Sequence, residues 1–358
     1  MKQLMIASTA LMLLLTADAT LAVVAADEPG WSAVVLPQTG ETPALVTGVA
    51  AGPDRLVAVG ERTCELKSDA EDDLGRCWGQ AWISTDGREW EAVEAPTSGL
   101  DLGMYQYDLH GPELGLADVA YGPGGFVAYG WAAPTASIDA EPETVMIEPT
   151  LWHSDDGTSW SRVPPPEGFS ASGLMHTGPR LRAIAGTGDG YLLGGTIYGR
   201  PAPRAAIWSS PDGLEWTLAG PKKAFDVGAY IDTMEVPFAG GITGFAVEPA
   251  IDGSTASLIA VGSSCPRATA GAGPKGRRWQ RWDWTIGRCR ARNWRSQDGM
   301  TWEARSLKDA SGSRVPNYAA STVAATADAT VIGVVSPEQV LHSRDGAIWT
   351  ASPDRNVG

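Results

Sequence analysis

The sequence is poor in basic residues and in cysteine, and after its N-terminal segment it has no long apolar run. It contains 27 lysines and arginines against 42 aspartates and glutamates, which gives a formal net charge of −15 at pH 7. Such an acidic surface repels phosphate, so we expect no specific nucleic-acid binding. No later apolar run could span a bilayer, and we expect no membrane anchor in the mature protein.

Metal and cofactor signatures are also lacking. The four cysteines and four histidines have neither the spacing of a compact zinc finger nor a His-x-His pair. The acidic stretch 65–76 lacks the glycine and glutamate register of an EF-hand calcium loop. His153 and His342 each precede a recurring serine within a predicted strand, which favours a packing role. The sequence therefore predicts no metal site and no cofactor.

The N-terminal segment, residues 1–26, has the layout of a secretory signal peptide. Lys2 supplies a positive charge, residues 4–15 are apolar, and small residues suit cleavage after Ala26. A membrane-spanning helix is the alternative, but Asp18 interrupts the run before it reaches about 20 residues. We expect a secreted, extracellular protein in which residues 27–358 form a single domain and the chain is a monomer.

Glycine and proline are abundant, with 43 and 25 of the 358 residues, which disfavours long helices and suits short strands joined by turns. One unit, Trp-x-Ser-x-Asp-Gly-x-x-Trp, recurs without gaps, although Leu341 replaces the first Trp of the last copy. The copies are AWISTDGREW, LWHSDDGTSW, IWSSPDGLEW, NWRSQDGMTW and VLHSRDGAIW. Their serines are Ser84, Ser154, Ser210, Ser296 and Ser343.

Each copy lies among four predicted short strands, which we call a to d in chain order. The repeat begins in strand c, and strand d follows the Asp-Gly turn, as in WEAVEAP at 90–96. Strand b is rich in small and β-branched residues, at 56–60, 125–130, 190–195, 258–262 and, more loosely, 330–335. Strand a precedes strand b, as at 46–52, 116–122 and 242–248.

Four antiparallel strands repeated at variable separations predict an all-β fold, a β-propeller of about five four-stranded blades. A solenoid is the competing repeat architecture, but it favours a more constant period. Residues 31–37, WSAVVLP, repeat the pattern of strand d without strands a to c before them. We expect this segment to help close the ring beside the last blade. That blade has its own candidate strand d at 348–353, so the blade number stays open.

The Ser-x-Asp-Gly sequence suits a tight turn between strands c and d. The aspartate can accept backbone N–H bonds across the turn, and the glycine supplies a positive φ. The following tryptophan can pack between blades. Five aspartates could instead suggest metal or acid–base sites, but one copy per blade would hold them far apart around a ring. These aspartates are Asp86, Asp156, Asp212, Asp298 and Asp345.

The repeat resembles the Asp-box, or bacterial neuraminidase repeat, written Ser-x-Asp-x-Gly-x-x-Trp. All five copies here lack the residue between Asp and Gly, so they form a shortened variant. The resemblance implies a β-propeller with the box as c–d turn at the periphery. It places function on the opposite face, formed by the b–c and d–a loops. Because this family includes sialidases, other glycosidases, sorting-receptor domains and proteins with no known reaction, the resemblance does not specify an activity.

A sialidase-type exo-glycosidase would need an arginine triad, a tyrosine nucleophile with a glutamate partner, and an acid–base aspartate. The family's early Arg-Ile-Pro motif is missing, and the similar tripeptides at Arg162 and Arg314 lie where the family would not place them. Tyrosines and arginines do occur in the predicted loops of the functional face. They are Tyr105, Tyr107, Tyr198, Tyr230, Tyr318, Arg180, Arg182, Arg200 and Arg204. No catalytic residue can be assigned from order alone.

The four cysteines of an exported chain suggest disulfides. Cys64 and Cys265 each follow the glycine that ends a strand b, and Cys77 and Cys289 each precede the first Trp of a repeat by the same spacing. The two pairs therefore occupy equivalent places in the first and fourth blades. We predict the bonds Cys64–Cys77 and Cys265–Cys289, each clamping a b–c loop. Zinc ligation is the weaker alternative.

One segment is strongly basic within this acidic chain. Between Cys265 and Ser296 there are nine basic residues and one acid. Arginine with interleaved tryptophan can stack on sugars and bind anionic groups through planar forks. The alternatives are a loop folded back on the acidic body and a subunit contact. The candidate ligand-binding residues are Arg277, Arg278, Trp279, Arg281, Trp282 and Trp284.

A second candidate is the aromatic and polar cluster Tyr105, Tyr107 and His110 in a predicted d–a loop. Such mixtures occur in sugar and peptide sites, although an ordinary packed loop is the simpler explanation. The main prediction is a secreted protein with a non-catalytic binding role through the b–c and d–a loops of one face. The ligand stays open between a glycan, a polyanion and another protein, and the alternative is a sialidase-like exo-glycosidase.

Overall fold

The computed structural model describes fifteen stretches of the 358-residue chain. These are residues 34–37, 45–66, 74–106, 114–133, 147–166, 180–197, 204–220, 222–225, 241–249, 256–264, 290–314, 320–326, 329–335, 338–344 and 348–351. Within these residues, no helix has both the length and the apolar character needed to cross a membrane.

The described chain forms five antiparallel sheets, each built from strands that are consecutive in sequence. The first sheet has the order β1 (Val46–Ala51), β2 (Leu56–Leu66), β3 (Leu74–Ser84) and β4 (Glu91–Ala92), with β5 (Asp101–Gln106) as an additional partner of β3. The second sheet has the order β6 (Gly115–Gly122), β7 (Gly125–Ala132), β8 (Glu148–Ser154) and β9 (Ser161–Val163). Strands a to d of the repeat therefore exist in both sheets.

The remaining three sheets repeat this order. The third contains β10 (Arg180–Thr187), β11 (Gly190–Ile197), β12 (Arg204–Ser210) and β13 (Thr217–Leu218). The fourth contains β14 (Gly241–Glu248), β15 (Ser257–Ser264), β16 (Arg290–Ser296) and β17 (Glu303–Ser306). The fifth contains β18 (Ala320–Ala325), β19 (Thr330–Val335), β20 (Glu338–Ser343) and β21 (Thr350–Ala351). The prediction of four-stranded antiparallel sheets, one per repeat, is confirmed for the described residues.

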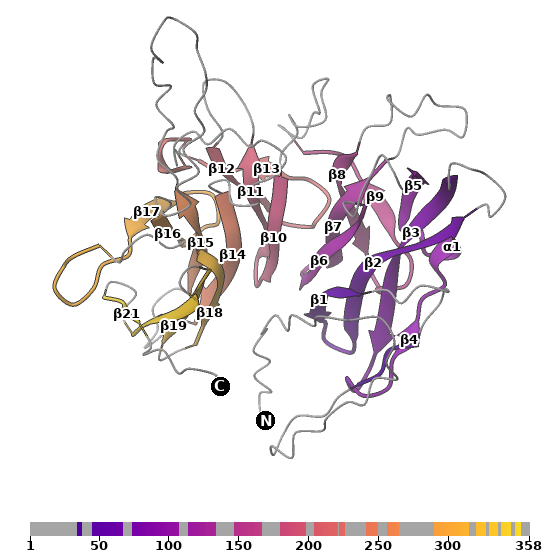
Figure 1. Ribbon diagram of the computed structural model, residues 1–358, viewed down its shortest axis with the longest axis horizontal. Coiled ribbons are helices and arrows are strands. Elements are labelled where there is room, and N and C mark those ends of the chain that lie inside the picture. Colours follow the sequence, from indigo (N-terminus) through magenta and orange to yellow (C-terminus); the bar gives the residue numbers. More distant parts are fainter. Residues whose placement is uncertain are drawn as a thin grey trace, which may run out of the picture.

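The sheets are fanned side by side, with strand a of each sheet innermost (Figure 1). Each inner strand packs against the inner strand of the next sheet: β1 on β6, β6 on β10, β10 on β14 and β14 on β18. Four apolar clusters fill these joints, and each draws residues from two neighbouring sheets. The core is therefore divided between the joints, and burial of each sheet depends on its neighbours.

The two ends of the fan are less well covered. No packing of comparable extent joins the fifth sheet to the first within the described residues. Val49 of β1 is 50% exposed, whereas its register equivalents Val119 and Val323 are 4% and 9% exposed. Residues 34–37, part of the segment expected beside the last blade, contact the first sheet, where Trp82 Nε1 donates to Pro37 O at 2.8 Å. Closure of the ring is therefore a proposal, taken up below.

The first sheet departs from the predicted pattern after its Asp-Gly turn. The predicted strand d at 90–96 is only the short β4, and a one-turn helix, α1 (Ala95–Ser98), follows it. Pro96 is compatible with the first turn of a helix but not with a longer ladder, and Gly99 ends α1 with φ 82°. Ser98 O then accepts Trp160 N–H of the second sheet at 2.7 Å, so this connection fastens two sheets together.

Candidate ligand-binding face

The two ends of the sheets carry very different connections. The c–d turns all have the same length and lie at 85–90, 155–160, 211–216, 297–302 and 344–349. The b–c connections vary widely and lie at 67–73, 133–147, 198–203, 265–289 and 336–337. In an antiparallel meander, a–b and c–d turns share one end of the sheet, which we call the turn end. The b–c and d–a connections share the other, which we call the variable end.

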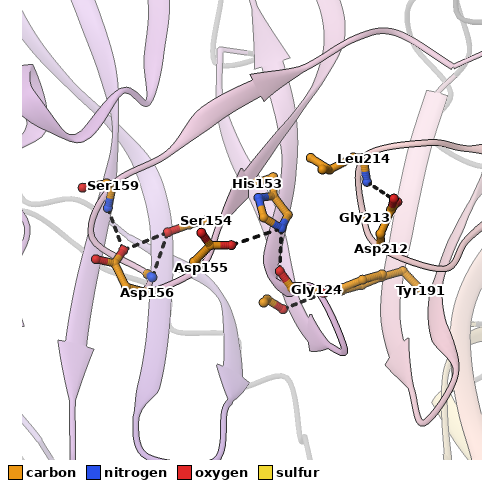
Figure 2. A network of polar contacts seen from close by, with 12 residues as sticks. Gly124, His153, Ser154, Asp155, Asp156, Ser159, Tyr191, Asp212, Gly213 and Leu214 are labelled. Atoms are coloured by element: carbon orange, nitrogen blue, oxygen red, sulfur yellow. Dashed lines mark hydrogen bonds and ion pairs between the residues drawn. The ribbon is translucent and has the colours of Figure 1, made fainter.

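At the turn end, each of the four described Asp-Gly turns is held by its own side chains, and Figure 2 shows the turns of Asp156 and Asp212. In the second sheet, Asp156 Oδ1 accepts N–H bonds from Thr158 at 2.8 Å and Ser159 at 3.0 Å. Ser154 Oγ accepts the Gly157 N–H at 2.8 Å, and Gly157 has φ 76°. The same bonds recur in the turns of Asp86, Asp212 and Asp298. Asp345 lies outside the described residues.

These hydrogen bonds keep the turn aspartates ionised. The Thr301 N–H bond, with a second from Met300, lowers the pKa of Asp298 to about 2. Burial alone would raise the pKa of Asp156, but bonds from Thr158, Ser159 and Ser154 outweigh it and lower the value to about 2. A carboxylate that is ionised and saturated by its own turn is a poor proton donor. The structural interpretation of the described repeat aspartates therefore holds, and no cluster of three or more potential metal ligands occurs among the described residues.

The joint between the second and third sheets shows what His153 does (Figure 2). Its Nε2 lies 2.6 Å from Gly124 O, and Tyr191 Oη donates to Gly125 O at 2.7 Å. The second tryptophan of the repeat also packs at such a joint, since Trp160 belongs to the apolar cluster between the first and second sheets. His153 is thus a packing residue, as its place in strand c predicted.

The sequence-predicted ligand residues are only partly described. Residues Arg277 to Trp284, Tyr107 and His110 lie outside the described residues. Tyr105, expected in a loop, belongs to strand β5 and pairs with Gly75 of β3. Arg180 and Arg182 were also expected in a loop and instead belong to β10, while Arg204 begins β12. The expectation that these residues lie in loops is therefore wrong, because backbone pairing includes them in strands.

The first cysteine pair has the predicted register. Cys64 of β2 lies directly opposite Cys77 of β3, and Cys77 is buried and disulfide-bonded. Directly opposed residues of an antiparallel pair are close enough for a disulfide, which supports the predicted Cys64–Cys77 bond. Cys265 and Cys289 lie outside the described residues.

A β-bulge interrupts the a–b ladder at the same place in every sheet. The bulged residues are Thr47, Ala117, Arg182, Thr243 and Ser321, and the residues that follow them are Gly48, Asp118, Ala183, Gly244 and Thr322. Opposite the latter, strand b carries Val59, Tyr129, Gly194, Val261 and Gly333. Arg182, Asp118 and Tyr129 are the only titratable side chains in these series. We call these three residues the inner-strand site.

Asp118 is held closely by the first sheet. A Cβ atom built on Gly48 would lie 2.3 Å from Asp118 Oδ1, so the carboxyl group occupies space that only a glycine leaves open. Asp118 Oδ1 accepts the Val119 N–H at 2.8 Å, and no ion pair to Asp118 occurs within the described residues. Although part of the side chain is exposed, burial of the carboxyl group raises its pKa to about 7.

Tyr129 and Arg182 lie close enough to interact electrostatically with each other. Tyr129 is 4% exposed, and burial raises its pKa. The negative charge of Asp118 raises that pKa further, whereas the positive charge of Arg182 acts in the opposite direction. Asp118 and Arg182 therefore both act electrostatically on the buried phenol of Tyr129, and they lie on the packed inner strands of the second and third sheets, close to the variable end.

Sequence reasoning missed this site although its signal was present. Asp118 stood inside a predicted strand a, and a residue-by-residue alignment of the five a strands would have shown one carboxylate among small, uncharged residues. The pairing of Asp118 with Tyr129 could not be predicted from the sequence, because it depends on a bulge that shifts the a–b register by one residue.

Comparison with known proteins gives no family for this chain. No protein-family description and no curated protein matches the sequence. Among solved structures, one from the GH130 family of mannoside phosphorylases has 10% identity, a TM-score of 0.35 and coverage of 86% of this chain and 83% of that one. A glycosyl hydrolase from Bacteroides ovatus has 10% identity, a TM-score of 0.32 and the same coverage.

A third solved structure is the β-fructofuranosidase from Schwanniomyces occidentalis. It has 9% identity, a TM-score of 0.35, and coverage of 88% of this chain and 56% of that one. Likenesses this distant assign no activity, so function has to be argued from the chain itself.

Proposed function

We propose that this chain is a secreted binding protein that takes an oligosaccharide at its variable end. The observation that carries the proposal is the contrast between the two ends of the five sheets. The turn end repeats one short, hydrogen-bonded turn, whereas the variable end carries connections of many lengths. A rigid scaffold with variable loops at one end is the usual arrangement of a binding site.

The proposal includes closure of the five sheets into an Asp-box β-propeller. Closure would cover Val49 at one end of the fan and Val331 at the other. Val331 is 36% exposed, whereas the equivalent residues Val57 and Ile259 of other sheets are fully buried. It would also bring all five variable ends around one axis. The basic residues of the 265–289 connection would then lie on the same face as the inner-strand site.

The experiment is retention on an immobilised panel of neutral, sulfated and sialylated oligosaccharides. We expect the full-length protein to retain at least one member, and replacement of Arg277, Arg278 and Arg281 by alanine to weaken retention of anionic members at least about tenfold. The control is Arg88→Ala, which removes an exposed arginine from the turn end. Equal loss in the control, or no retention by the unaltered protein, would contradict the proposal.

A sialidase-type exo-glycosidase is the second candidate, and Asp118 is the observation that favours it. A carboxyl group with a pKa of about 7 can donate a proton near neutral pH, as an acid catalyst must. Within the described residues, however, no tyrosine is hydrogen-bonded to a glutamate. Turnover of a fluorogenic sialoside panel that Asp118→Ala abolishes would favour this candidate over binding without reaction.

A further inference from the structure

The internal repeat provides a control for every residue of the inner-strand site. Five sheets share one bulge, yet only the second and third place ionisable groups there. The first and fourth sheets have Gly48 and Gly244 at the position of Asp118. They have Thr47 and Thr243 at the position of Arg182. Both sheets nevertheless form the same ladder. The fold therefore requires neither the carboxylate nor the guanidinium group, and a role other than folding accounts for them better.

The first sheet is adapted to hold Asp118 in place. Gly48 leaves the space in which the carboxyl group lies, and the Val119 N–H fixes one of its oxygens. Thr47 Oγ1 donates to Leu116 O at 2.9 Å and thereby joins β1 to β6 beside this contact. The corresponding bond from Thr243 to Ala320 joins the fourth and fifth sheets, where no carboxylate is present. The joint is thus general, and Gly48 and Gly244 both allow a close approach of the next inner strand, whereas the carboxyl group beside Gly48 occurs only in the second sheet.

The location is suited to a ligand. Asp118 and Arg182 lie close to the first residues of β6 and β10, where the d–a connections of the variable end enter the inner strands. Both side chains are partly exposed, whereas the phenol beside them is buried and can act only as support. They lie on the packed inner strands β6 and β10, so one oligosaccharide could contact both the carboxyl and the guanidinium groups.

We propose that Asp118 and Arg182 form the floor of the oligosaccharide site and bind adjacent hydroxyl groups of one sugar residue. Arg182 donates hydrogen bonds to the sugar oxygens, and the Asp118 carboxyl group both donates and accepts. Vicinal hydroxyls match such a pair because each is at once a donor and an acceptor. This inference rests on the proposed binding function and names the residues and the ligand group within it.

The protonation state of Asp118 depends on few neighbours. Of the described side chains on strands packed against β6, the titratable or charged ones are Glu61 on β2, Arg76 on β3, Tyr129 on β7, Arg182 on β10 and Tyr191 on β11. β1 carries none, and Arg76 is already paired with Asp101 at 2.6 Å. The protonated carboxyl group is the form that can donate to a sugar oxygen. Retention should therefore weaken as pH rises from about 5.5 to about 8.5.

The test uses the same immobilised oligosaccharide panel with variants that copy the other sheets. Asp118→Ala and Arg182→Thr install residues found at the equivalent positions of the third sheet and of the first and fourth sheets. We expect each to weaken retention at least about tenfold. Asp118→Asn keeps a donor and an acceptor, so it should retain the sugar with little dependence on pH. Thr322→Ala, at the same position in the fifth sheet, should change nothing.

Each outcome decides the matter. Retention by the unaltered protein that survives Asp118→Ala and Arg182→Thr overturns this inference and leaves the binding function standing. If the unaltered protein retains no oligosaccharide, both this inference and the proposed binding function are overturned. Far-UV circular dichroism and thermal unfolding check the fold. An Asp118→Asn variant that unfolds would show that the carboxylate has a structural role instead, and a folded Asp118→Asn variant that binds no better than Asp118→Ala would contradict the donor and acceptor role.

Discussion

At the residue scale, the pKa of Asp118 and the pKa values of the turn aspartates Asp156 and Asp298 are shifted in opposite directions. The pKa values of Asp156 and Asp298 are lowered to about 2, because backbone N–H groups of their own turns bind the charged form. Asp118 has a pKa of about 7, because burial penalises its charge and only one N–H group compensates. Proton affinity therefore distinguishes the inner-strand site from the repeated scaffold.

This difference predicts how stability depends on pH. For Asp118 the folded pKa lies above the unfolded value of about 4, so the free energy of unfolding falls as pH rises from about 4 to about 7. Asp118→Asn removes that decline and should be more stable than the unaltered protein at about pH 8. Thermal unfolding midpoints at about pH 5 and about pH 8 measure the effect. Parallel pH profiles for the two proteins would show that Asp118 titrates normally.

At the element scale, the c–d turn is the repeated unit of stability. Removing Asp156 by Asp156→Ala deletes two backbone bonds and the bonds from two hydroxyls, and should lower the free energy of unfolding by about 1–3 kcal/mol. The loss should be complete above about pH 4 and shrink as pH falls toward about 2, because the lowered pKa stabilises the ionised form over this range.

The neighbouring residue provides the control for that prediction. Asp155 has a side chain that is 93% exposed and lies 3.9 Å from His153, and Asp155→Ala should leave stability almost unchanged. Denaturant unfolding of the two variants gives the comparison. Equal effects in both would show that the charge, and not the turn geometry, matters.

The sequence predicted these elements to different degrees, for physical reasons. Strand b of every sheet was placed within a few residues, because apolar β-branched runs that end in turns are strong local signals. The helix α1 and the strand β5 were missed, because they replace an extended strand d through contacts with Trp160 and with the end of β3. Such contacts join residues far apart in the chain, and local patterns do not contain them.

The candidate site was predicted least well. The repeat identified the end of the sheets at which function was expected, since the fixed turns exclude the other end. Arg182 was named only as one arginine of an expected loop, and Asp118 was not identified, because their relation depends on a bulge and on the packing of two inner strands. The candidate ligand-binding residues were instead selected in loops because of their composition. The basic segment at 265–289 lies outside the described residues.

At the scale of the whole molecule, the uncovered faces of the first and fifth sheets predict closure. Val331 of β19 has equivalents that pack into the joint with the next sheet, and Val49 of β1 has equivalents that pack into the joint with the preceding one. If the ring closes, Val49→Asp and Val331→Asp each bury a charge and should lower the thermal midpoint by several degrees. Leu214→Asp, at an exposed turn-end residue, is the control.

An open fan gives the opposite result. Both valines would then stay in water, and their replacement by aspartate would be harmless or would improve solubility. In a third case, a second copy of the chain covers both faces. Size-exclusion chromatography of the unaltered protein distinguishes this case, because the chain would then elute as a dimer.

The central claim is that the ligand binds at the variable end, over the inner strands of the second and third sheets. Hydrogen–deuterium exchange with and without the best-retained oligosaccharide tests it most directly. We expect ligand-dependent protection at 115–119 and 180–184, and no change in the c–d turns at 155–160 and 211–216. Protection confined to those turns would contradict the account.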